Sequence, residues 1–316
     1  MSTLVNDMSH ESHWSNEEAV TNYLSQQLLL GRLAIFLGSG VSFNFNLPNW
    51  AGLIGALCKI ASIDFPPIGY PEKVTLLQIA SSLRRGYFEN SDDKFVEAVA
   101  TELYRSADVA IERLCEDRLF AAIGATLTSS ARGGVSTVLT LNYDDCLERY
   151  LEILGFVVDP IINPSHWASR ADISIMHPHG FLPYDRARSR SSEIVLDQTS
   201  FSNAIGNVGS LWFQRIVGVL RTSTTLLIGL GTGDQNLLSM LKAAKTDHPS
   251  ENDGAKYNCV MVQVDPNRMA AESIKDHGVS TFPLRDNKTH LPDFLLSICQ
   301  KAAVTRRAQL CVDIRP

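Results

Sequence analysis

The sequence predicts an α/β fold, built on a doubly wound and mostly parallel sheet with an all-helical insertion. Short, continuous apolar runs alternate with amphipathic stretches of ten or more residues, as expected for buried strands joined by helices. Several runs end directly in glycine or polar residues, as strands do at the ligand-binding edge of an open α/β sheet. One long stretch between the first two runs has helical patterns only. The sheet is therefore expected to be Rossmann-like.

The bulk composition is that of a globular protein and argues against several classes of function. Of 316 residues, 45% are hydrophobic and 20% are charged, and the net charge of −6 gives no basic surface for DNA or RNA. Because no run of 18 apolar residues and no basic, apolar leader occur, we expect a cytoplasmic protein without a membrane segment. Six cysteines without a CxxC pair favour neither a disulfide framework nor a zinc cluster.

The expected elements follow from the spacing of apolar residues. Strands are expected at residues 33–37, 136–141, 156–161, 173–177, 194–196, 224–230 and 258–264. Helices are expected at residues 15–31, 50–60, 74–87, 94–104, 109–126, 143–154, 199–207, 208–221, 235–245 and 291–303. The first helix opens with capping-box spacing between Ser15 and Glu18.

The chain is expected to form a single unit over residues 1–316. Residues 32–49 and 132–290 would form the Rossmann-like core, and residues 50–131 the helical insertion. Residues 291–316 would form a C-terminal helix and tail.

The loop after the first strand is rich in glycine. Its residues are Gly38, Ser39, Gly40, Val41 and Ser42. Glycines would let the backbone approach a pyrophosphate closely, although a plain tight turn would use the same residues.

Two further strand ends carry polar side chains that suit chemistry. Asn142 and Asp144 follow the strand at 136–141, where ligands bind in open α/β sheets. His177 and His179 follow the strand at 173–177, and Gly180 allows a sharp bend there. Histidine can act as an acid or a base near neutral pH. We interpret His177 as a satisfied structural group and His179 as the functional one.

The strand at 224–230 also ends in glycines, before Asp234, which is placed to cap the next helix. We assign Gly229, Gly231 and Asp234 to cofactor binding, although a flexible connection with a helix cap would look the same. Asp265, after the strand at 258–264, is assigned to the same group.

The four strand ends together resemble the SIR2 family. The similarity lies in the loop at 38–42, Leu47-Pro48 with Trp50 shortly after, the TLNYD segment at 140–144, the pair His179-Gly180 and the turn at 229–234. It spans about residues 30–290. The order of the TxNxD and HG segments is its most specific part.

The resemblance implies NAD+ as the substrate, with its pyrophosphate on the loop at 38–42. Asn142 would hold the ribose and a water molecule, and His179 would act as general base. Asp144 would bind the nicotinamide amide.

One departure from sirtuin deacylases bears on the substrate. These enzymes carry a four-cysteine zinc module after the HG pair, but this sequence has no cysteine between Cys146 and Cys259. We therefore expect no zinc. The Tyr143 and Gly231-to-Asp234 variants of the motifs instead resemble the bacterial SIR2-like branch of anti-phage defence, whose members hydrolyse NAD+ without an acyl-peptide.

The leading hypothesis is an NAD+ glycohydrolase that forms nicotinamide and ADP-ribose, as the effector of an abortive-infection system. A homo-oligomer is expected, with a regulatory partner such as a HerA-type ATPase or an Argonaute-like protein. The first alternative is a zinc-free protein deacylase or ADP-ribosyltransferase. The second is a non-catalytic sensor of NAD+ or ADP-ribose.

Overall fold

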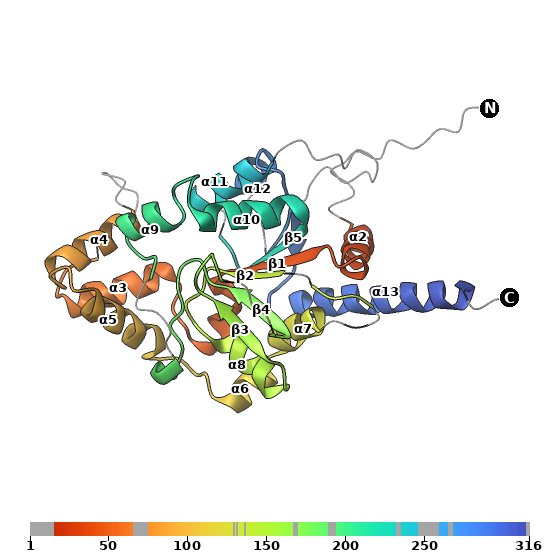
Figure 1. Ribbon diagram of the computed structural model, residues 1–316, viewed down its shortest axis with the longest axis horizontal. Coiled ribbons are helices and arrows are strands. Elements are labelled where there is room, and N and C mark those ends of the chain that lie inside the picture. Colours follow the sequence, from red (N-terminus) through yellow and green to blue (C-terminus); the bar gives the residue numbers. More distant parts are fainter. Residues whose placement is uncertain are drawn as a thin grey trace.

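A parallel sheet lies at the centre of the computed structural model (Figure 1). The structure describes residues 16–65, 75–128, 130, 132–135, 137–166, 170–188, 194–231, 235–245, 259–264 and 268–313. In this part of the chain, seven strands form one sheet in the order β3-β4-β2-β1-β5-β6-β7, with every pairing parallel. The predicted α/β, Rossmann-like fold is confirmed. The strands are β1 (Leu33–Leu37), β2 (Thr137–Thr140), β3 (Val158–Ile161), β4 (Ile173–Met176), β5 (Thr224–Ile228), β6 (Cys259–Val264) and β7 (Val279–Leu284).

Helices cover both faces of the sheet, and only helices join β1 to β2 in the described residues. The segment between these strands contains α3 (Trp50–Ile60), α4 (Leu76–Gly86), α5 (Asp92–Tyr104), α6 (Ile111–Glu116) and α7 (Arg118–Leu127), after short 3-10 turns at Ser39–Val41 and Phe43–Phe45. The other helices are α2 (Glu17–Leu29), α8 (Cys146–Ile153), α9 (Gln198–Ala204), α10 (Leu211–Thr222), α11 (Gln235–Ala244), α12 (Arg268–Lys275) and α13 (His290–Asp313), and a 3-10 turn spans Arg186–Arg188.

Two hydrophobic cores lie on opposite faces of the sheet, because successive strand side chains point to opposite sides. From β1, Leu33, Ile35 and Leu37 enter the core that packs on α2, α7, α8 and α13. Phe36 enters the other core, which packs on α10 and α11. Figure 1 shows α10, α11 and α12 on one side of the sheet and α7 and α8 on the other. Burial on both faces explains why the strand sequences are continuously apolar.

Several predicted elements differ from the structure. Residues 194–196 form no strand, because the Val195 carbonyl accepts from the Tyr143 hydroxyl at 2.7 Å and the Val195 N–H donates to the His179 carbonyl at 2.7 Å. The helix expected at 109–126 is broken at Asp117, which is extended (φ −76°, ψ 116°) and caps α7 through Phe120 N–H. β7 and α12 were not predicted, and α13 continues beyond the expected end at residue 303.

The loops after β1 and β5 approach each other through their backbones. Gly38 N–H donates to Ile228 O at 2.9 Å, and Gly40 N–H donates to Gly229 O at 3.1 Å. A Cβ atom on Gly40 would lie 2.7 Å from Gly229 Cα, and Gly229 itself has φ +69°. No larger side chain fits at this contact without moving a backbone.

Asp145, at the start of α8, is a buried carboxyl that is only half satisfied. Oδ1 accepts from Tyr184 N–H at 3.1 Å, whereas Oδ2 has no hydrogen-bond partner and lies 3.9 Å from Arg188 Nη1. Burial raises the pKa of Asp145 to about 6, against the lowering effect of the Tyr184 N–H, and the Glu148 charge adds to the increase.

We predict that Gly40→Ala lowers the free energy of unfolding by about 3 kcal/mol, the upper end of the usual cost of overpacking, because the clash is with backbone. Denaturant unfolding measures the change. Gly231→Ala is the matched control, since a Cβ there meets nothing within 4 Å. Equal stability of the two variants would contradict the contact.

We predict that Asp145→Asn changes how stability depends on pH. Folded Asp145 keeps its proton up to about pH 6, whereas an unfolded aspartate loses it near pH 4. The folded state therefore binds more protons between these values, and wild-type stability falls as pH rises. Relative to Asp145→Asn, the wild type should lose about 3 kcal/mol between pH 4 and about pH 7. A pH-independent difference between the two unfolding free energies would refute this.

Candidate functional site

A pocket of about 430 Å³ lies at the carboxyl edge of the sheet, where the loops after β1, β2, β4 and β5 meet. The pairing register places Leu37 beside both Thr140 and Ile228, so the three following loops begin at one level. The predicted site residues on its wall are Gly38, Ser39, Ser42, Asn142, Asp144, His179, Gly229 and Gly231. The strand ends recognised in the sequence thus come together in one place.

The glycine loop is closed largely on itself and on β5. Besides the two N–H groups that reach the β5 loop, Val41 N–H donates to Gly38 O at 3.2 Å and Ser42 N–H donates to Ser39 O at 3.1 Å. Val41 is buried and does not line the pocket. A pyrophosphate on this loop would therefore be contacted by groups other than these four N–H groups.

Ser42, Asn142 and Asp144 form a hydrogen-bonded chain in the pocket wall. Asn142 Nδ2 donates to Ser42 Oγ at 3.1 Å, and the Ser42 hydroxyl donates to Asp144 Oδ2 at 3.0 Å. Asp144 Oδ1 accepts from Cys146 N–H at 3.3 Å. One amide hydrogen and the amide oxygen of Asn142 have no part in this chain, which leaves a donor and an acceptor for a ligand.

Asp144 lies in an environment that disfavours its charge. Burial raises the pKa of its carboxyl group, the hydrogen bond from Ser42 opposes this, and the nearby Glu148 charge adds to the increase. A cavity of about 10 Å³ lies beside these hydrogen-bonded side chains and has room for about one water molecule. Its lining includes Ser42, Asn142, Asp144 and Glu148.

His179 lies in a sharp turn that is fixed from both sides. Gly180, with φ 101°, donates its N–H to His177 O at 3.1 Å, and the His179 carbonyl accepts from Val195 N–H. The Tyr143 and His179 rings lie 6.4 Å apart between centroids. The 194–196 segment thus holds both the Tyr143 hydroxyl and the His179 backbone.

His177 is a satisfied core group, as the sequence predicted. Its side chain is fully buried, with Nε2 2.6 Å from Glu148 Oε1 and Nδ1 3.1 Å from Asn142 O. Its ring packs edge-on against Phe181 at a centroid distance of 4.8 Å.

The helical segment supplies a wall of the pocket, whose residues other than Trp50 were not singled out from the sequence. Asn49 and Trp50 from the start of α3, Leu77 from α4 and Leu103 from α5 line it. Trp50 Nε1 is buried without a hydrogen-bond partner. Trp50 belongs to the motifs that carry the resemblance, whereas Leu77 and Leu103 have the same sequence pattern as ordinary core residues.

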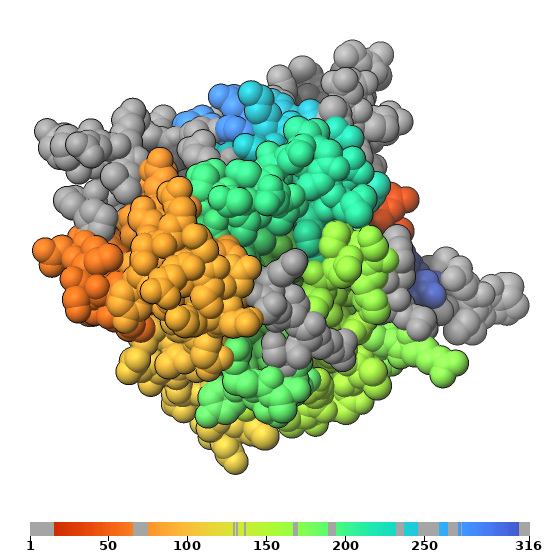
Figure 2. Space-filling model, turned by 60° about the vertical axis from the view of Figure 1, so that its left-hand side comes forward, coloured from red at the N-terminus to blue at the C-terminus, as the bar shows by residue number. Residues whose placement is uncertain are grey.

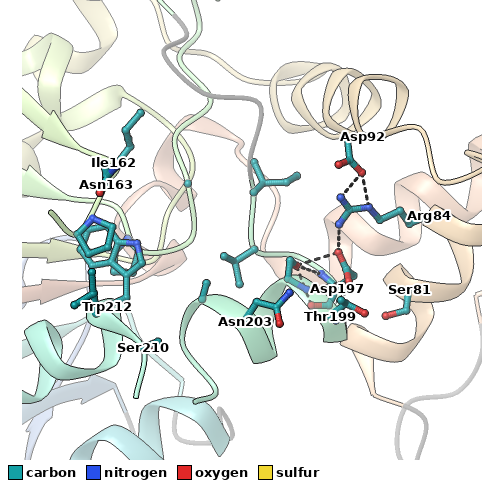
Figure 3. A pocket seen from close by; sticks show the side chains of 18 of the residues that line it. Ser81, Arg84, Asp92, Ile162, Asn163, Asp197, Thr199, Asn203, Ser210 and Trp212 are labelled. Atoms are coloured by element: carbon teal, nitrogen blue, oxygen red, sulfur yellow. Dashed lines mark hydrogen bonds and ion pairs between the residues drawn. The ribbon is translucent and has the colours of Figure 1, made fainter. Parts of the chain in front are cut away.

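A second, larger groove of about 1050 Å³ lies on the other side of the His179 turn, with Pro178, Gly180 and Val195 in its wall. Figure 3 shows Arg84 on one side of it, bonded to both Asp92 and Asp197. Asn163 and Trp212 lie on the opposite side.

The Arg84 contact ties the helical segment to the loop that holds His179. Asp197 is buried and also caps α9 through the N–H groups of Thr199 and Ser200. Although burial by itself raises the pKa of Asp197, the hydrogen bonds from Ser200 and Arg84 lower it overall. Ser81 Oγ accepts from Gln198 N–H at 3.0 Å, and Figure 2 shows the α4–α5 surface (orange) against the α9–α10 surface (green).

Some predicted features lie outside the described residues or were not found within them. Asp234 and Asp265, both assigned to cofactor binding, fall outside the part of the chain that the structure describes. Among the described residues, no cluster of His, Cys, Asp and Glu could hold a metal ion. In the same residues, no helix combines the length and apolar character that crossing a bilayer requires.

Comparison with protein families supports the resemblance found in the motifs. Residues 136–282 match the model of the SIR2-like domain, a segment that includes Asn142, Asp144, His179 and the loop after β5. No curated protein matches the sequence. On this match, together with the convergence of the motifs in one pocket, residues 136–282 are assigned as a SIR2-like domain.

Proposed function

We propose that the protein is an NAD+ glycohydrolase, which cleaves NAD+ to nicotinamide and ADP-ribose. The SIR2-like domain fits an NAD-utilising enzyme in general. The observation that carries the finer proposal is the convergence of Asn142, Asp144 and His179 on a single 430 Å³ pocket. Polar groups that meet in one largely apolar pocket are the usual arrangement of a ligand site.

The reaction breaks the bond between the nicotinamide nitrogen and C1′ of the ribose, and the electron pair leaves with nicotinamide. Positive charge then develops at C1′, and a water oxygen adds there. The site must orient the ribose and water and take up the proton that the water loses.

Asn142 suits the first task. Its Nδ2 is held by Ser42, so the amide plane is fixed while one N–H and the oxygen stay available. The N–H would donate to a ribose oxygen, and the oxygen would accept from the attacking water.

His179 would accept the proton of that water as general base, a role typically worth about 10²- to 10⁴-fold in rate. Asp144 would accept from the nicotinamide amide, because each carboxylate oxygen can accept a further hydrogen bond beyond those from Ser42 and Cys146.

We extend the proposal to regulation: the protein acts as the effector of an anti-phage abortive-infection system, as a homo-oligomer with an activating partner of the HerA-type ATPase or Argonaute-like kind. The resemblance of the motifs to the bacterial SIR2-like branch supports this. Assays should therefore include the protein alone, its assemblies and candidate partners.

We predict that Asn142→Ala and His179→Ala each reduce nicotinamide release by at least about 100-fold, because each removes a group that acts on the reacting water. Release is measured by product chromatography under conditions in which the wild type is active. His166→Ala is the matched control, since that imidazole pairs with Asp159 away from the pocket and should leave the rate unchanged. Full turnover by either pocket variant would exclude its assigned role.

The 1050 Å³ groove beside the His179 turn favours one second candidate, in which a protein binds there and either accepts ADP-ribose or gives up the acyl group of an acyl-lysine to ADP-ribose. Nicotinamide release that requires an acyl-lysine peptide or protein acceptor would select it. Binding of NAD+ without cleavage under every condition would instead indicate a sensor.

A further inference from the structure

Directly behind Asn142, two ionisable side chains pack against each other away from solvent. His177 follows β4 with its side chain fully buried, and the Glu148 side chain, in the first turn of α8, is 2% exposed. Neither residue lines the 430 Å³ pocket, whereas Asn142 does. The pair can thus affect a ligand there only through residues such as Asn142.

The contacts of the imidazole ring show where its protons lie. A carbonyl oxygen can only accept, so Nδ1 carries a hydrogen and donates it to Asn142 O at 3.1 Å. The 2.6 Å contact between Nε2 and Glu148 Oε1 also requires a proton, since a nitrogen lone pair and a carboxylate oxygen would repel each other. His177 and Glu148 therefore share one proton as a single hydrogen-bonded unit.

This unit links the two loops that bear the proposed reacting groups. The Asn142 backbone is held at both of its polar groups. Its N–H donates to Thr140 Oγ1 at 3.1 Å, within its own loop, and its carbonyl contacts His177 Nδ1, from the loop of His179. His177 also accepts Gly180 N–H in the tight turn that contains His179. The position of Asn142 relative to His179 is thus set through a residue that touches both loops.

We propose that His177, oriented by Glu148, is a positioning residue that places Asn142 relative to His179 for the reaction. The inference rests on the proposed function for the roles of Asn142 and His179. The hydrogen bonds that carry it do not depend on that function.

Two substitutions at one position separate positioning from structural support. In asparagine, the amide nitrogen is as many bonds from Cα as imidazole Nδ1, so His177→Asn keeps a donor for Asn142 O and loses the Glu148 contact. In glutamine, the amide nitrogen corresponds to Nε2, so His177→Gln keeps the Glu148 contact and loses the donor to Asn142.

We predict opposite effects for the two variants. His177→Gln should lower kcat by about 100-fold, the size of effect expected from misplacing a reacting group by about 1 Å, with KM for NAD+ within about three-fold of wild type. His177→Asn should keep most of kcat but lower the midpoint of thermal unfolding by several degrees, because the Glu148 carboxylate loses its partner. The proposal would be overturned if kcat fell in proportion to stability in both variants. It would also be overturned if His177→Gln kept the wild-type kcat.

If either variant fails to fold, the comparison is made between His177→Asn and His177→Gln in a Glu148→Gln background, which removes the buried charge. Hydrogen–deuterium exchange of residues 141–144 gives a readout that does not depend on activity. Faster exchange in the glutamine variant than in the asparagine variant supports positioning, and equal exchange refutes it. If the wild type releases no nicotinamide, the proposed function is wrong. The exchange experiment then still tests whether His177 positions the Asn142 backbone.

Discussion

The structure depends on a close backbone contact between two loops at the carboxyl edge of the sheet. With no side chain on Gly40 or Gly229, the loop after β1 closes onto the loop after β5, and both Gly38 and Gly40 donate hydrogen bonds across the contact. This closure fixes the turn that carries Ser42. The Ser42 hydroxyl contacts both Asp144 Oδ2 and Asn142 Nδ2, and so it fixes the side chain of Asn142. Glycines that in the sequence fit either a phosphate loop or a plain tight turn are thus required for the fold before any ligand binds.

The same region holds more buried ionisable groups than stability alone would favour. Asp144, Asp145 and Glu148 are all buried within one turn of chain, and His177 is a base that contacts one of them. Burying an unpaired charge is costly, and the raised pKa values of Asp144 and Asp145 express that cost. A wholly apolar interior would be more stable but could not orient an amide and a carboxyl toward a pocket, so this concentration of charge is best explained by function.

The sheet and the strand-end residues could be predicted from the sequence, because buried parallel strands are continuously apolar and their carboxyl ends share one edge. Residues 194–196 show the limit of this reasoning. Their apolar composition matches a strand, but hydrogen bonds from Tyr143 and to His179, both distant in sequence, hold Val195 in a loop instead. β7 was missed because Pro283 interrupts its apolar pattern, which an edge strand tolerates. The leucines that α4 and α5 contribute to the pocket wall could not be singled out from the sequence, because leucines at helical spacing have the same pattern whether they face a core or a pocket.

That wall is connected by hydrogen bonds to the turn that holds His179, the proposed general base. Arg84 on α4 bonds Asp197, two residues after Val195, and Val195 bonds both the His179 backbone and the Tyr143 hydroxyl. Asp197 is buried and anchors α9 as well, so α4 cannot move away from α9 without disturbing the segment that holds His179. The helical segment therefore does more than line the pocket, because Arg84 also bonds the segment that holds the His179 turn. The proposed activating partner, by acting on α4, would reach His179 through two contacts, Arg84–Asp197 and Val195–His179, without entering the pocket.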